Sequence, residues 1–229
     1  MIKKGIVLAG GTGSRMSPVT KAVNKQLLPL YDKPLIYYPI SILMLAKIKD
    51  ILIIVNKGQV DQFKKVLPNG DNLGIRIRYE EQDKPRGLPD AFLVGEKFIG
   101  NSSVALILGD NFFYGQSLTK RLTNCTRLTA GAKVFLYPVK DPSLYGVATI
   151  GRDDKIISII EKPKKFISNL AVTGLYFFDN KVVEFSKSLK PSKRGEIEIV
   201  DLLNKYKNKK KLSAEMIGRG AAWLDTGSI

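Results

Sequence analysis

KGIVLAGGTGSR, residues 4–15, combines a short apolar run with a glycine-rich turn. A continuous apolar run of this length is typical of a strand buried on both faces, as in parallel sheets. Glycines directly after such a strand let the backbone approach a phosphate closely and point several N–H groups toward it. The stretch therefore predicts the first strand of an α/β sheet, Lys4–Ala9, and a candidate phosphate-binding turn at its carboxyl end. A turn of this kind also occurs as a purely structural feature.

The residues inside the turn favour phosphate over two better-known nucleotide motifs. Thr12 and Ser14 add small hydroxyl donors, and Arg15 can bind a phosphate with two parallel hydrogen bonds. A dinucleotide G-x-G-x-x-G motif that started at Gly11 would need glycine where Met16 stands. A P-loop would need Gly-Lys-Ser/Thr at its end, which is missing here.

Outward from this turn, residues 1–130 alternate short apolar runs with helical patterns. This alternation predicts a mainly parallel, Rossmann-like mixed sheet with helices on both faces and ligands at the carboxyl ends of its strands. The predicted strands are Lys4–Ala9, Ile51–Val55, Ile75–Tyr79 and Val104–Leu108, and the predicted helices are Pro34–Ala46, Gln59–Leu67 and Leu88–Phe98.

Beyond about residue 130 strands dominate, and we expect them to widen the same sheet. The predicted strands are Lys133–Val139, Val147–Ile150, Ile156–Ile160 and Ala171–Phe178, with a helix over Glu196–Tyr206 and a short strand leading to Trp223. We therefore expect one domain over residues 1–229, in which the strands beyond about residue 130 add a substrate-facing lobe.

Composition excludes several kinds of chemistry. The chain has no histidine, which rules out Ser-His-Asp and Cys-His nucleophiles and histidine-ligated zinc, so any metal must be a hard cation such as Mg²⁺. Its one cysteine, Cys125, allows no internal disulfide and fits a cytoplasmic setting. No apolar stretch is long enough to span a membrane. The net charge of +16 suits an anionic partner, although no nucleic-acid motif accompanies it.

Three charged residues outside the turn are candidates for the chemistry. Asp110 ends an apolar strand in Leu108-Gly109-Asp110-Asn111, where a carboxylate is well placed for Mg²⁺, although it could equally cap its own turn. Asp225 in Trp223-Leu224-Asp225-Thr226-Gly227 is a similar strand-end carboxylate. Lys25 could neutralise a departing pyrophosphate.

Taken together, the motifs closely resemble those of the glucose-1-phosphate thymidylyltransferases, within the sugar-phosphate nucleotidyltransferase family. The matching stretches are GIVLAGGTGSRMSPVTKAVNKQLLPLYDKPLIYYPI (5–40), LGDNFFYG (108–115), DPSLYGV (141–147), EKP (161–163), NLAVTGLYFFD (169–179), RGEIEIVDL (194–202) and GRGAAWLDTG (218–227). The resemblance implies the nucleotide-diphospho-sugar transferase fold.

The resemblance also implies a reaction: an Mg²⁺-dependent transfer from dTTP to glucose 1-phosphate that yields dTDP-glucose and pyrophosphate. It further implies a homo-oligomer that serves the dTDP-rhamnose pathway and cell-surface polysaccharide biosynthesis. The implied nucleotide-binding residues are Leu8, Gly10, Gly11, Thr12, Gly13, Ser14, Arg15, Gln26, Gln82, Pro85, Gly87 and Asp110. The implied sugar-phosphate residues are Leu88, Tyr145, Gly146, Glu161, Lys162, Val172 and Trp223. Arg15, Lys25, Asp110, Lys162 and Asp225 are the implied catalytic residues, with Asp110 and Asp225 holding the metal.

Two departures from the family pattern leave other functions open. The chain has Gly87-Leu88-Pro89-Asp90-Ala91 where the family usually has Gly-Leu-Ala-Gln-Ala, and it stops at Ile229 where the family continues into further helices. We therefore expect the usual C-terminal extension to be absent. The alternatives are a uridylyltransferase that uses UTP, a regulatory module that binds a nucleotide without catalysis, and a nucleic-acid binder.

Overall fold

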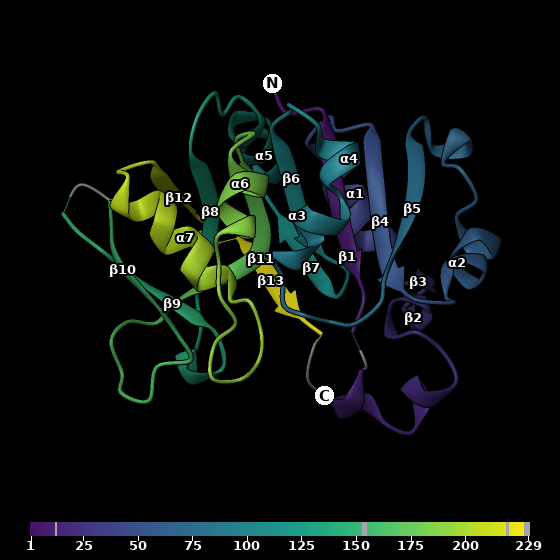
Figure 1. The fold of residues 1–229 in the computed structure, drawn as a ribbon, viewed down its shortest axis with the longest axis horizontal. Helices are drawn as coiled ribbons and strands as arrows, with labels where there is room; N and C mark the ends of the chain where they lie inside the picture. The colour runs from purple at the N-terminus through teal and green to yellow at the C-terminus, as the bar shows by residue number, and fades with distance from the viewer. Residues whose placement is uncertain (12, 153–154, 219, 227–229) are drawn as a thin grey trace.

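The computed structural model describes residues 1–11, 13–152, 155–218 and 220–226, and a nine-stranded mixed sheet forms its centre (Figure 1). The strands run in the order β10-β9-β11-β6-β1-β4-β5, and β8 pairs with both β11 and β12. These strands are β1 (Lys4–Ala9), β4 (Asp50–Asn56), β5 (Arg76–Gln82), β6 (Val104–Leu108), β8 (Ala132–Pro138), β9 (Gly146–Ile150), β10 (Ile156–Glu161), β11 (Leu170–Phe178) and β12 (Leu212–Met216). Two small ribbons lie beside the sheet: β2 (Pro29–Leu30) with β3 (Lys33–Pro34), and β7 (Asn111–Gly115) with β13 (Ala221–Asp225).

Helices cover both faces of the sheet. They are α1 (Tyr37–Leu45), α2 (Val60–Val66), α3 (Asp90–Val94), α4 (Glu96–Ile99), α5 (Leu118–Thr126), α6 (Val182–Lys187) and α7 (Ile199–Asn208). Short 3-10 turns are η1 (Ser14–Met16), η2 (Val19–Lys21), η3 (Lys25–Leu27), η4 (Asp71–Leu73) and η5 (Pro142–Leu144). Among the described residues, no helix has the length and apolar composition to cross a membrane.

Strands β6, β1, β4 and β5 are parallel, which brings their carboxyl ends to one edge of the sheet. Lys4 of β1 lies opposite both Asp50 of β4 and Val104 of β6, so the strands start level. They consequently end level, and the glycine-rich turn, the end of β5 and Asp110 are neighbours at that edge. This is where α/β sheets bind ligands.

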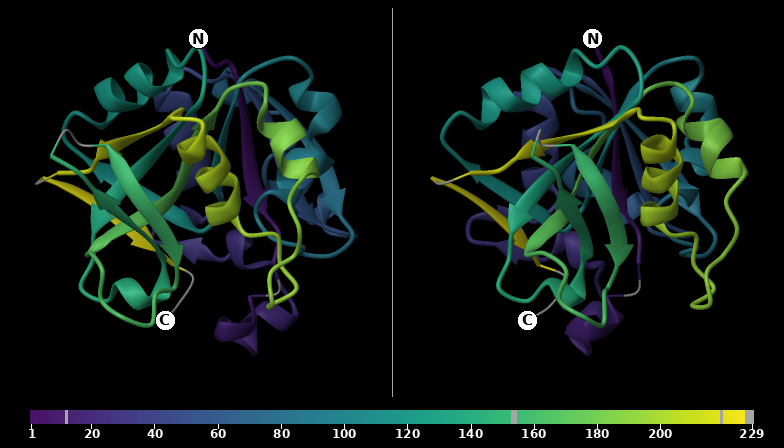
Figure 2. Two further views of the ribbon diagram at one scale, coloured as in Figure 1. Left: turned by 60° about the vertical axis from the view of Figure 1, so that its left-hand side comes forward. Right: turned by 90° about the vertical axis from the view of Figure 1, so that its left-hand side faces the viewer.

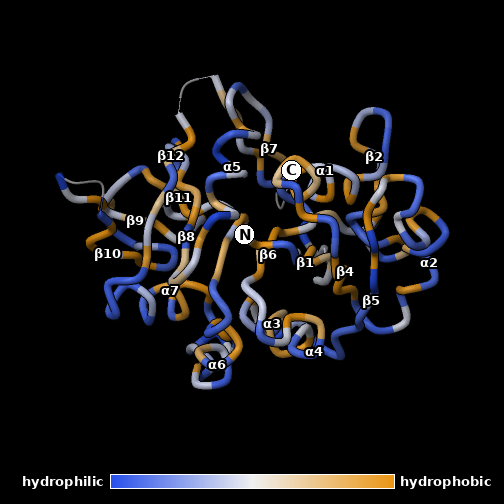
Figure 3. The backbone as a smooth tube through the Cα atoms, turned by 90° about the horizontal axis from the view of Figure 1, so that it is seen from above, coloured by the Kyte–Doolittle hydropathy of each residue, from blue (hydrophilic) through white to orange (hydrophobic). Residues whose placement is uncertain are grey.

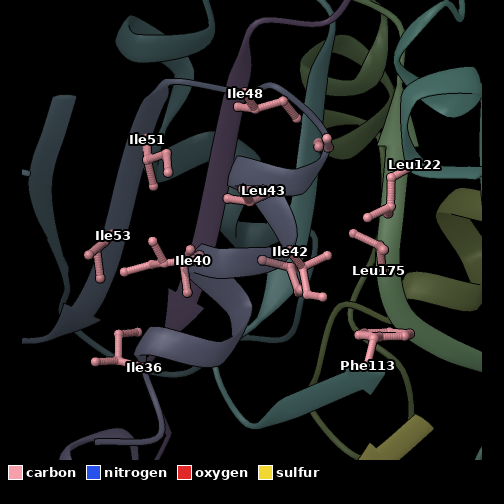
Figure 4. Close-up of a cluster of buried hydrophobic side chains, with 14 of the residues drawn as sticks. Ile36, Ile40, Ile42, Leu43, Ile48, Ile51, Ile53, Phe113, Leu122 and Leu175 are labelled. Carbon is pink, nitrogen blue, oxygen red and sulfur yellow. The ribbon is translucent and has the colours of Figure 1, made fainter. Parts of the chain in front are cut away.

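Alternate residues of the central strands enter two separate cores. In β4, Ile51 and Ile53 face α1, α2 and α5, whereas Leu52 and Ile54 face α3 and α4. Figure 4 shows the first core, where Leu43 and its neighbours on α1 pack against these strands. Both faces of the strand are buried, which explains the uninterrupted apolar runs in the sequence.

The edge strand β5 is far more hydrophilic than β4 beside it, as Figure 3 shows. The sequence of β5, RIRYEEQ, alternates because one of its faces is solvated. Ile77 is buried in the first core while Arg76 and Arg78 are exposed. This edge therefore has the charges that discourage pairing with another chain.

The second half extends the sheet with antiparallel strands. β11 is antiparallel to β6, and β9 and β10 form a hairpin that projects beside α7 (Figure 2). The expectation that these strands widen the same sheet is confirmed. Gly146 at the start of β9 pairs with Glu161 at the end of β10.

All of the predicted strands are present, some with slightly different bounds, and one predicted helix is wrong. The helix predicted over Leu88–Phe98 is in fact two helices, α3 and α4, which meet at Gly95. A Cβ on Gly95 would lie 3.0 Å from the Ala91 carbonyl oxygen and 3.1 Å from Ile6, so the chain turns where it packs tightly on β1. The prediction also missed β2, β3, β7, β12, α5 and α6.

Candidate active site

The glycine-rich turn is held by two amide side chains from neighbouring strands. The Gly11 N–H donates to Asn56 Oδ1 at 3.0 Å, and Asn56 Nδ2 donates to the Gly11 carbonyl at 2.8 Å. Gln82 Nε2 donates to the same Asn56 oxygen at 3.0 Å. A Cβ on Gly10 would lie 1.8 Å from Gln82 Nε2, so any side chain there would displace the buried Gln82 amide. Gln82 is thus buried beside the turn.

Lys25 and Asp110 form an ion pair at the same edge. Lys25 Nζ lies 3.0 Å from Asp110 Oδ2, and Lys25 is only 8% exposed. The helical turn η3 that carries Lys25 is capped by Asn24, whose Nδ2 also donates to the Ala9 carbonyl at 3.1 Å. Lys25 is therefore anchored to the end of β1, and it lies within reach of any anion that binds beside Asp110.

A hollow of about 320 Å³ opens at the carboxyl ends of the parallel strands. Most of the predicted nucleotide-binding residues line it, namely Leu8, Gly10, Gly11, Arg15, Gln26, Gln82, Pro85, Gly87 and Asp110, together with the predicted sugar residue Leu88. Leu108 and Glu196 also line it and were not predicted. Thr12 lies outside the described residues, and Gly13 accepts a hydrogen bond from Thr20 Oγ1 at 2.8 Å without lining the hollow.

Asn111, which is 1% exposed, joins three strands around Asp110 and was missed by the sequence reasoning. Its Oδ1 accepts from the Gly174 N–H at 3.0 Å and from Trp223 Nε1 at 2.6 Å. Its Nδ2 donates to Asp110 Oδ1 at 3.1 Å. One buried amide thus fixes the orientation of the Asp110 carboxylate relative to β11 and β13. The only signal in the sequence is its place directly after a strand-end aspartate.

Asp225 lies beside Asp110 because β13 pairs with β7. Asp225 is opposite Asn111 in the register, and the backbone N–H and the hydroxyl of Thr226 donate to the Asp110 carbonyl at 3.1 and 2.8 Å. Within the described parts of the chain, no group of three or more His, Cys, Asp or Glu residues forms a metal cage. Two neighbouring carboxylates that leave other positions to substrate phosphates and water are a donor set that fits Mg²⁺.

The predicted sugar-side residues come together at the start of β9 and the end of β10. Gly146 pairs with Glu161, and a Cβ on Gly146 would lie 3.2 Å from Glu161 Oε2. The Lys162 N–H donates to the Tyr145 carbonyl at 2.9 Å, which fixes the start of the loop after β10. Val172 is buried in β11. Tyr145 and Gly146 at the start of β9 therefore lie next to Glu161 and Lys162 at the end of β10.

Glu161 is surrounded by charges from the loop before α7. Its pKa is raised, first because it is partly buried and second because Glu198 is nearby, while Arg194 opposes the shift. Arg194 Nη2 lies 3.8 Å from Glu161 Oε1 and 3.0 Å from Glu198 Oε2. Sequence reasoning did not assign Arg194 to the site, although it falls within one of the quoted motifs.

The two predicted aromatic residues pack on each other. The rings of Tyr145 and Trp223 pack edge to face with their centroids 5.2 Å apart. Trp223 is 6% exposed, and its indole N–H donates to Asn111 Oδ1. Burial raises the pKa of the Tyr145 phenol, and the negative charge of Asp225 adds to the shift. Trp223 thus packs under Tyr145 from the core.

A larger hollow, about 630 Å³, lies at the opposite, amino-terminal edge of the parallel strands. Lysines and Arg76 line it, and none of the predicted site residues does. The larger volume alone would favour this hollow. The smaller hollow is favoured as the active site because it lies at the carboxyl ends of the strands and is lined by Asp110 and Arg15.

Residues 4–229 match the family model described as Nucleotidyl transferase. The match spans nearly the whole chain, and the fold and the strand-end site agree with it. The chain therefore belongs to the nucleotidyl transferase family.

Sequence relatives of this chain belong to one branch of that family. The chain is 54% identical over 225 residues to a glucose-1-phosphate thymidylyltransferase of Neisseria meningitidis serogroup A, which covers 98% of this chain and 78% of the relative. It is 51% identical to a protein of the same name from Xanthomonas campestris pv. campestris strain B100, over 99% of this chain and 77% of the relative.

Solved structures agree with the fold. A Bacillus anthracis crystal structure in complex with sucrose, provisionally named a glucose-1-phosphate thymidylyltransferase, superposes with a TM-score of 0.90 at 42% identity over 98% of this chain and 90% of that one. A UDP-glucose pyrophosphorylase complexed with UDP-glucose superposes with a TM-score of 0.85 at 29% identity over 100% of this chain and 94% of that one. The resemblance stated from the motifs is confirmed.

Proposed function

We propose that this chain transfers a thymidylyl group from dTTP to glucose 1-phosphate, giving dTDP-glucose and pyrophosphate. The observation that carries the proposal is the hollow that Arg15, Gln82, Gly87 and Asp110 line together at the carboxyl ends of the parallel strands. The choice of thymidylyl and of glucose rests on the names of the relatives, which are about half identical to this chain over almost its full length.

The nucleotide would lie in the hollow with its base toward Gln82 and its phosphates toward the glycine-rich turn. The Gln82 amide can both donate and accept, which suits the edge of thymine. Arg15 lines the hollow, and Lys25 is ion-paired to Asp110 beside it. In the proposed complex both cations would lie on the side of the departing pyrophosphate. They would neutralise the charge that grows there as the bond breaks.

Glucose 1-phosphate would bind on the other side of Asp110. Glu161 would accept from sugar hydroxyls, while Lys162 and the nearby Arg194 would bind the sugar's phosphate. Because Arg194 already lies between Glu161 and Glu198, it is available to an incoming phosphate without a large movement.

The reaction itself is an in-line displacement. An oxygen of the sugar phosphate forms a bond to the α-phosphorus, and the bond from that phosphorus to the bridging oxygen breaks. The bridging oxygen leaves with the bonding electron pair as part of pyrophosphate. No base is required because the attacking phosphate is already an anion, in agreement with the absence of histidine. The protein's task is to hold two anions in line and to offset their charge.

Asp110 and Asp225 would hold Mg²⁺, which when bound supplies positive charge next to the α-phosphate. Asn111 would keep Asp110 turned toward that position through its 3.1 Å hydrogen bond. The other Asp110 oxygen contacts Lys25, so the carboxylate is oriented at both ends.

We further propose the setting of this reaction. The nucleotide-binding half covers about residues 1–130 and the sugar-phosphate-binding half about 131–229. The chain works in the cytoplasm as a homo-oligomer and supplies an activated sugar to the dTDP-rhamnose pathway and to cell-surface polysaccharide biosynthesis. These assignments follow from the resemblance of the motifs and from the names of the relatives.

Pyrophosphate release tests the proposal directly. The purified chain is mixed with Mg²⁺, glucose 1-phosphate and either dTTP or UTP, and release is followed with glucose 1-phosphate omitted as the control. We expect release that requires both substrates and is faster with dTTP. Faster release with UTP would replace the proposal with a uridylyltransferase, and nucleotide binding without release would replace it with a regulatory module.

A further inference from the structure

Asp90 is a buried carboxylate close to the active site that has no place in the mechanism above. It is the first residue of α3 and is 1% exposed. Its partner is Arg86, four residues earlier, whose Nε donates to Asp90 Oδ2 at 3.3 Å and whose Nη2 lies 3.1 Å from Oδ1. The Arg86 side chain is 65% exposed, so this pairing is what holds it in place. Asp90 does not line the nucleotide hollow, whereas Pro85 and Gly87 on either side of Arg86 do.

The backbone of Arg86 bonds to a segment that is distant in sequence. The Ile197 N–H donates to the Arg86 carbonyl at 2.7 Å. Gly87 next to it has φ +110, and a Cβ there would lie 2.1 Å from the Ile197 carbonyl oxygen. The loop that lines the nucleotide hollow and the segment before α7 are therefore in direct backbone contact, with no room for a side chain between them.

The segment that Arg86 contacts carries Arg194. Residues 192–198 are internally bonded: the Ser192 N–H donates to the Glu196 carbonyl at 2.8 Å, and the Gly195 N–H donates to the Ser192 carbonyl at 2.9 Å. Arg194 is bound to Glu198 within the segment and lies 3.8 Å from Glu161 of the sugar side. Displacing Ile197 would thus displace the guanidinium that faces Glu161.

From these contacts we propose that Asp90 is a positioning residue that couples the nucleotide loop to the sugar-phosphate side, through Arg86 and Ile197 to Arg194. The inference rests on the proposed function for the identity of the two ligands. A nucleotide that orders residues 82–87 would, through this chain of contacts, place Arg194 for the phosphate of the sugar.

Amide hydrogen exchange tests the physical link without any reaction. In Asp90→Asn, a nearly isosteric change that removes the charge, we expect exchange within residues 192–198 to rise about fivefold or more, the lower end of couplings typical between sites. We also expect dTTP to slow exchange of this segment in the native chain but not in the variant. Glu96→Gln is the matched control, because Glu96 of α4 forms an ion pair with Lys187 of α6, outside this chain of contacts.

Steady-state kinetics tests the consequence for the reaction. At saturating dTTP, Asp90→Asn should raise the KM for glucose 1-phosphate about fivefold or more, while kcat changes by less than about twofold, since the groups at the reacting atoms remain. Arg86→Gln should give the same shift, and the double variant Arg86→Gln/Asp90→Asn should add little to either single change. Arg86→Gln alters an exposed side chain, so it also serves if Asp90→Asn folds poorly.

Three outcomes would overturn the inference. Unchanged exchange at residues 192–198 in both single variants would remove the link itself. Equal losses in kcat and in the affinities for both substrates, with a lower Tm, would show that the pair only stabilises the fold. Fully additive effects in the double variant would show that Arg86 and Asp90 act separately. Failure of the proposed function is distinguishable, because it appears as absent pyrophosphate release in the native chain while the exchange experiment still decides the link.

Discussion

At the scale of single residues, the site depends on charges whose partners are visible in the structure. Asp110 illustrates this, because each of its side-chain oxygens has its own contact, Lys25 on one and Asn111 on the other. Its backbone carbonyl is used separately, by Thr226. The chemical and structural roles of Asp110 therefore reside in different atoms and can be separated by mutation.

Replacing Asp110 with Asn should lower turnover by about 10²–10³-fold while the chain stays folded, because removal of one preorganised charge typically costs that much in rate. The Thr226 bonds to the backbone carbonyl are retained in this variant. Initial rates of pyrophosphate release and a circular dichroism melt would measure both effects. Asp61→Asn, on the exposed side of α2, is the control and should behave as the native chain. Near-normal turnover in Asp110→Asn would refute the assigned role. Lys162→Ala should show a similar loss of turnover.

The raised pKa of Glu161 predicts a pH dependence of sugar binding. The ionised carboxylate accepts from hydroxyls, so binding weakens as pH falls through the raised pKa, above the ordinary glutamate value of about 4.3. As the pH is lowered, the KM for glucose 1-phosphate should therefore begin to rise at a higher pH than it would if Glu161 had an ordinary glutamate pKa. Glu161→Gln removes this titration but keeps that of the substrate phosphate, whose second pKa is about 6. If the two KM profiles are parallel on the acid side, Glu161 does not contribute.

At the scale of secondary-structure elements, the site depends on how strands from the two halves meet. Asn111 begins β7, and its amide reaches β11 through Gly174 and β13 through Trp223. Gly174 is required for this approach, since a Cβ there would lie 2.4 Å from Asn111 Oδ1. The arrangement predicts that stability and catalysis respond differently to different changes at position 111.

Asn111→Ala should lower the free energy of unfolding by about 2–6 kcal/mol, because it leaves two buried donors without an acceptor at roughly 1–3 kcal/mol each. Asn111→Asp keeps the acceptor for both donors, so we expect a smaller loss of stability. It loses the donor to Asp110 and adds a second carboxylate beside it, so turnover should fall instead. Urea unfolding and pyrophosphate release on both variants would check this. An alanine variant as stable as the native chain would contradict the role of Asn111 as a junction between strands.

At the scale of the whole molecule, one sheet holds two kinds of strand pairing, and the site lies where they join. The parallel strands β6, β1, β4 and β5 end at the hollow that Arg15 and Asp110 line, and the antiparallel strands β9 and β10 carry Gly146 and Glu161, which we predict to bind the sugar. A ligand that bridges this junction binds only the folded state. It should therefore stabilise the entire cooperative unit rather than one half.

Mg²⁺ with dTTP should raise the free energy of unfolding by about 2.7 kcal/mol when the nucleotide is present at about 100 times its Kd. Removing the metal with EDTA should reduce this stabilisation and abolish pyrophosphate release, and added Mg²⁺ should restore both. Thermal melts with dTTP, UTP and glucose 1-phosphate would measure the effect. Stabilisation without release would favour the regulatory module. Salt-sensitive binding of unrelated duplex DNA would instead favour the nucleic-acid binder that the +16 charge left open.

The sequence by itself determined the strands whose surroundings are uniform. β1 and β6 begin and end as predicted, because an apolar run between turn residues can only be buried on both faces. The glycine-rich turn at the end of β1 could equally be predicted from the sequence, since close approach of the backbone depends on local residue size. Its role beside a phosphate stays a prediction. Motif order along the chain was enough to predict the family, which the comparisons confirm.

The tertiary structure decided which of these residues meet. Asp110 and Asp225 are neighbours only because β13 pairs with β7, a short strand that the sequence pattern did not predict. The contacts of Asn111 with Trp223, of Arg194 with Glu161 and of Ile197 with Arg86 likewise join residues far apart in the chain. Local propensity carries no information about register between distant strands or about the packing of one loop on another. Those contacts are set by the burial of both sheet faces at once, which only the complete fold provides.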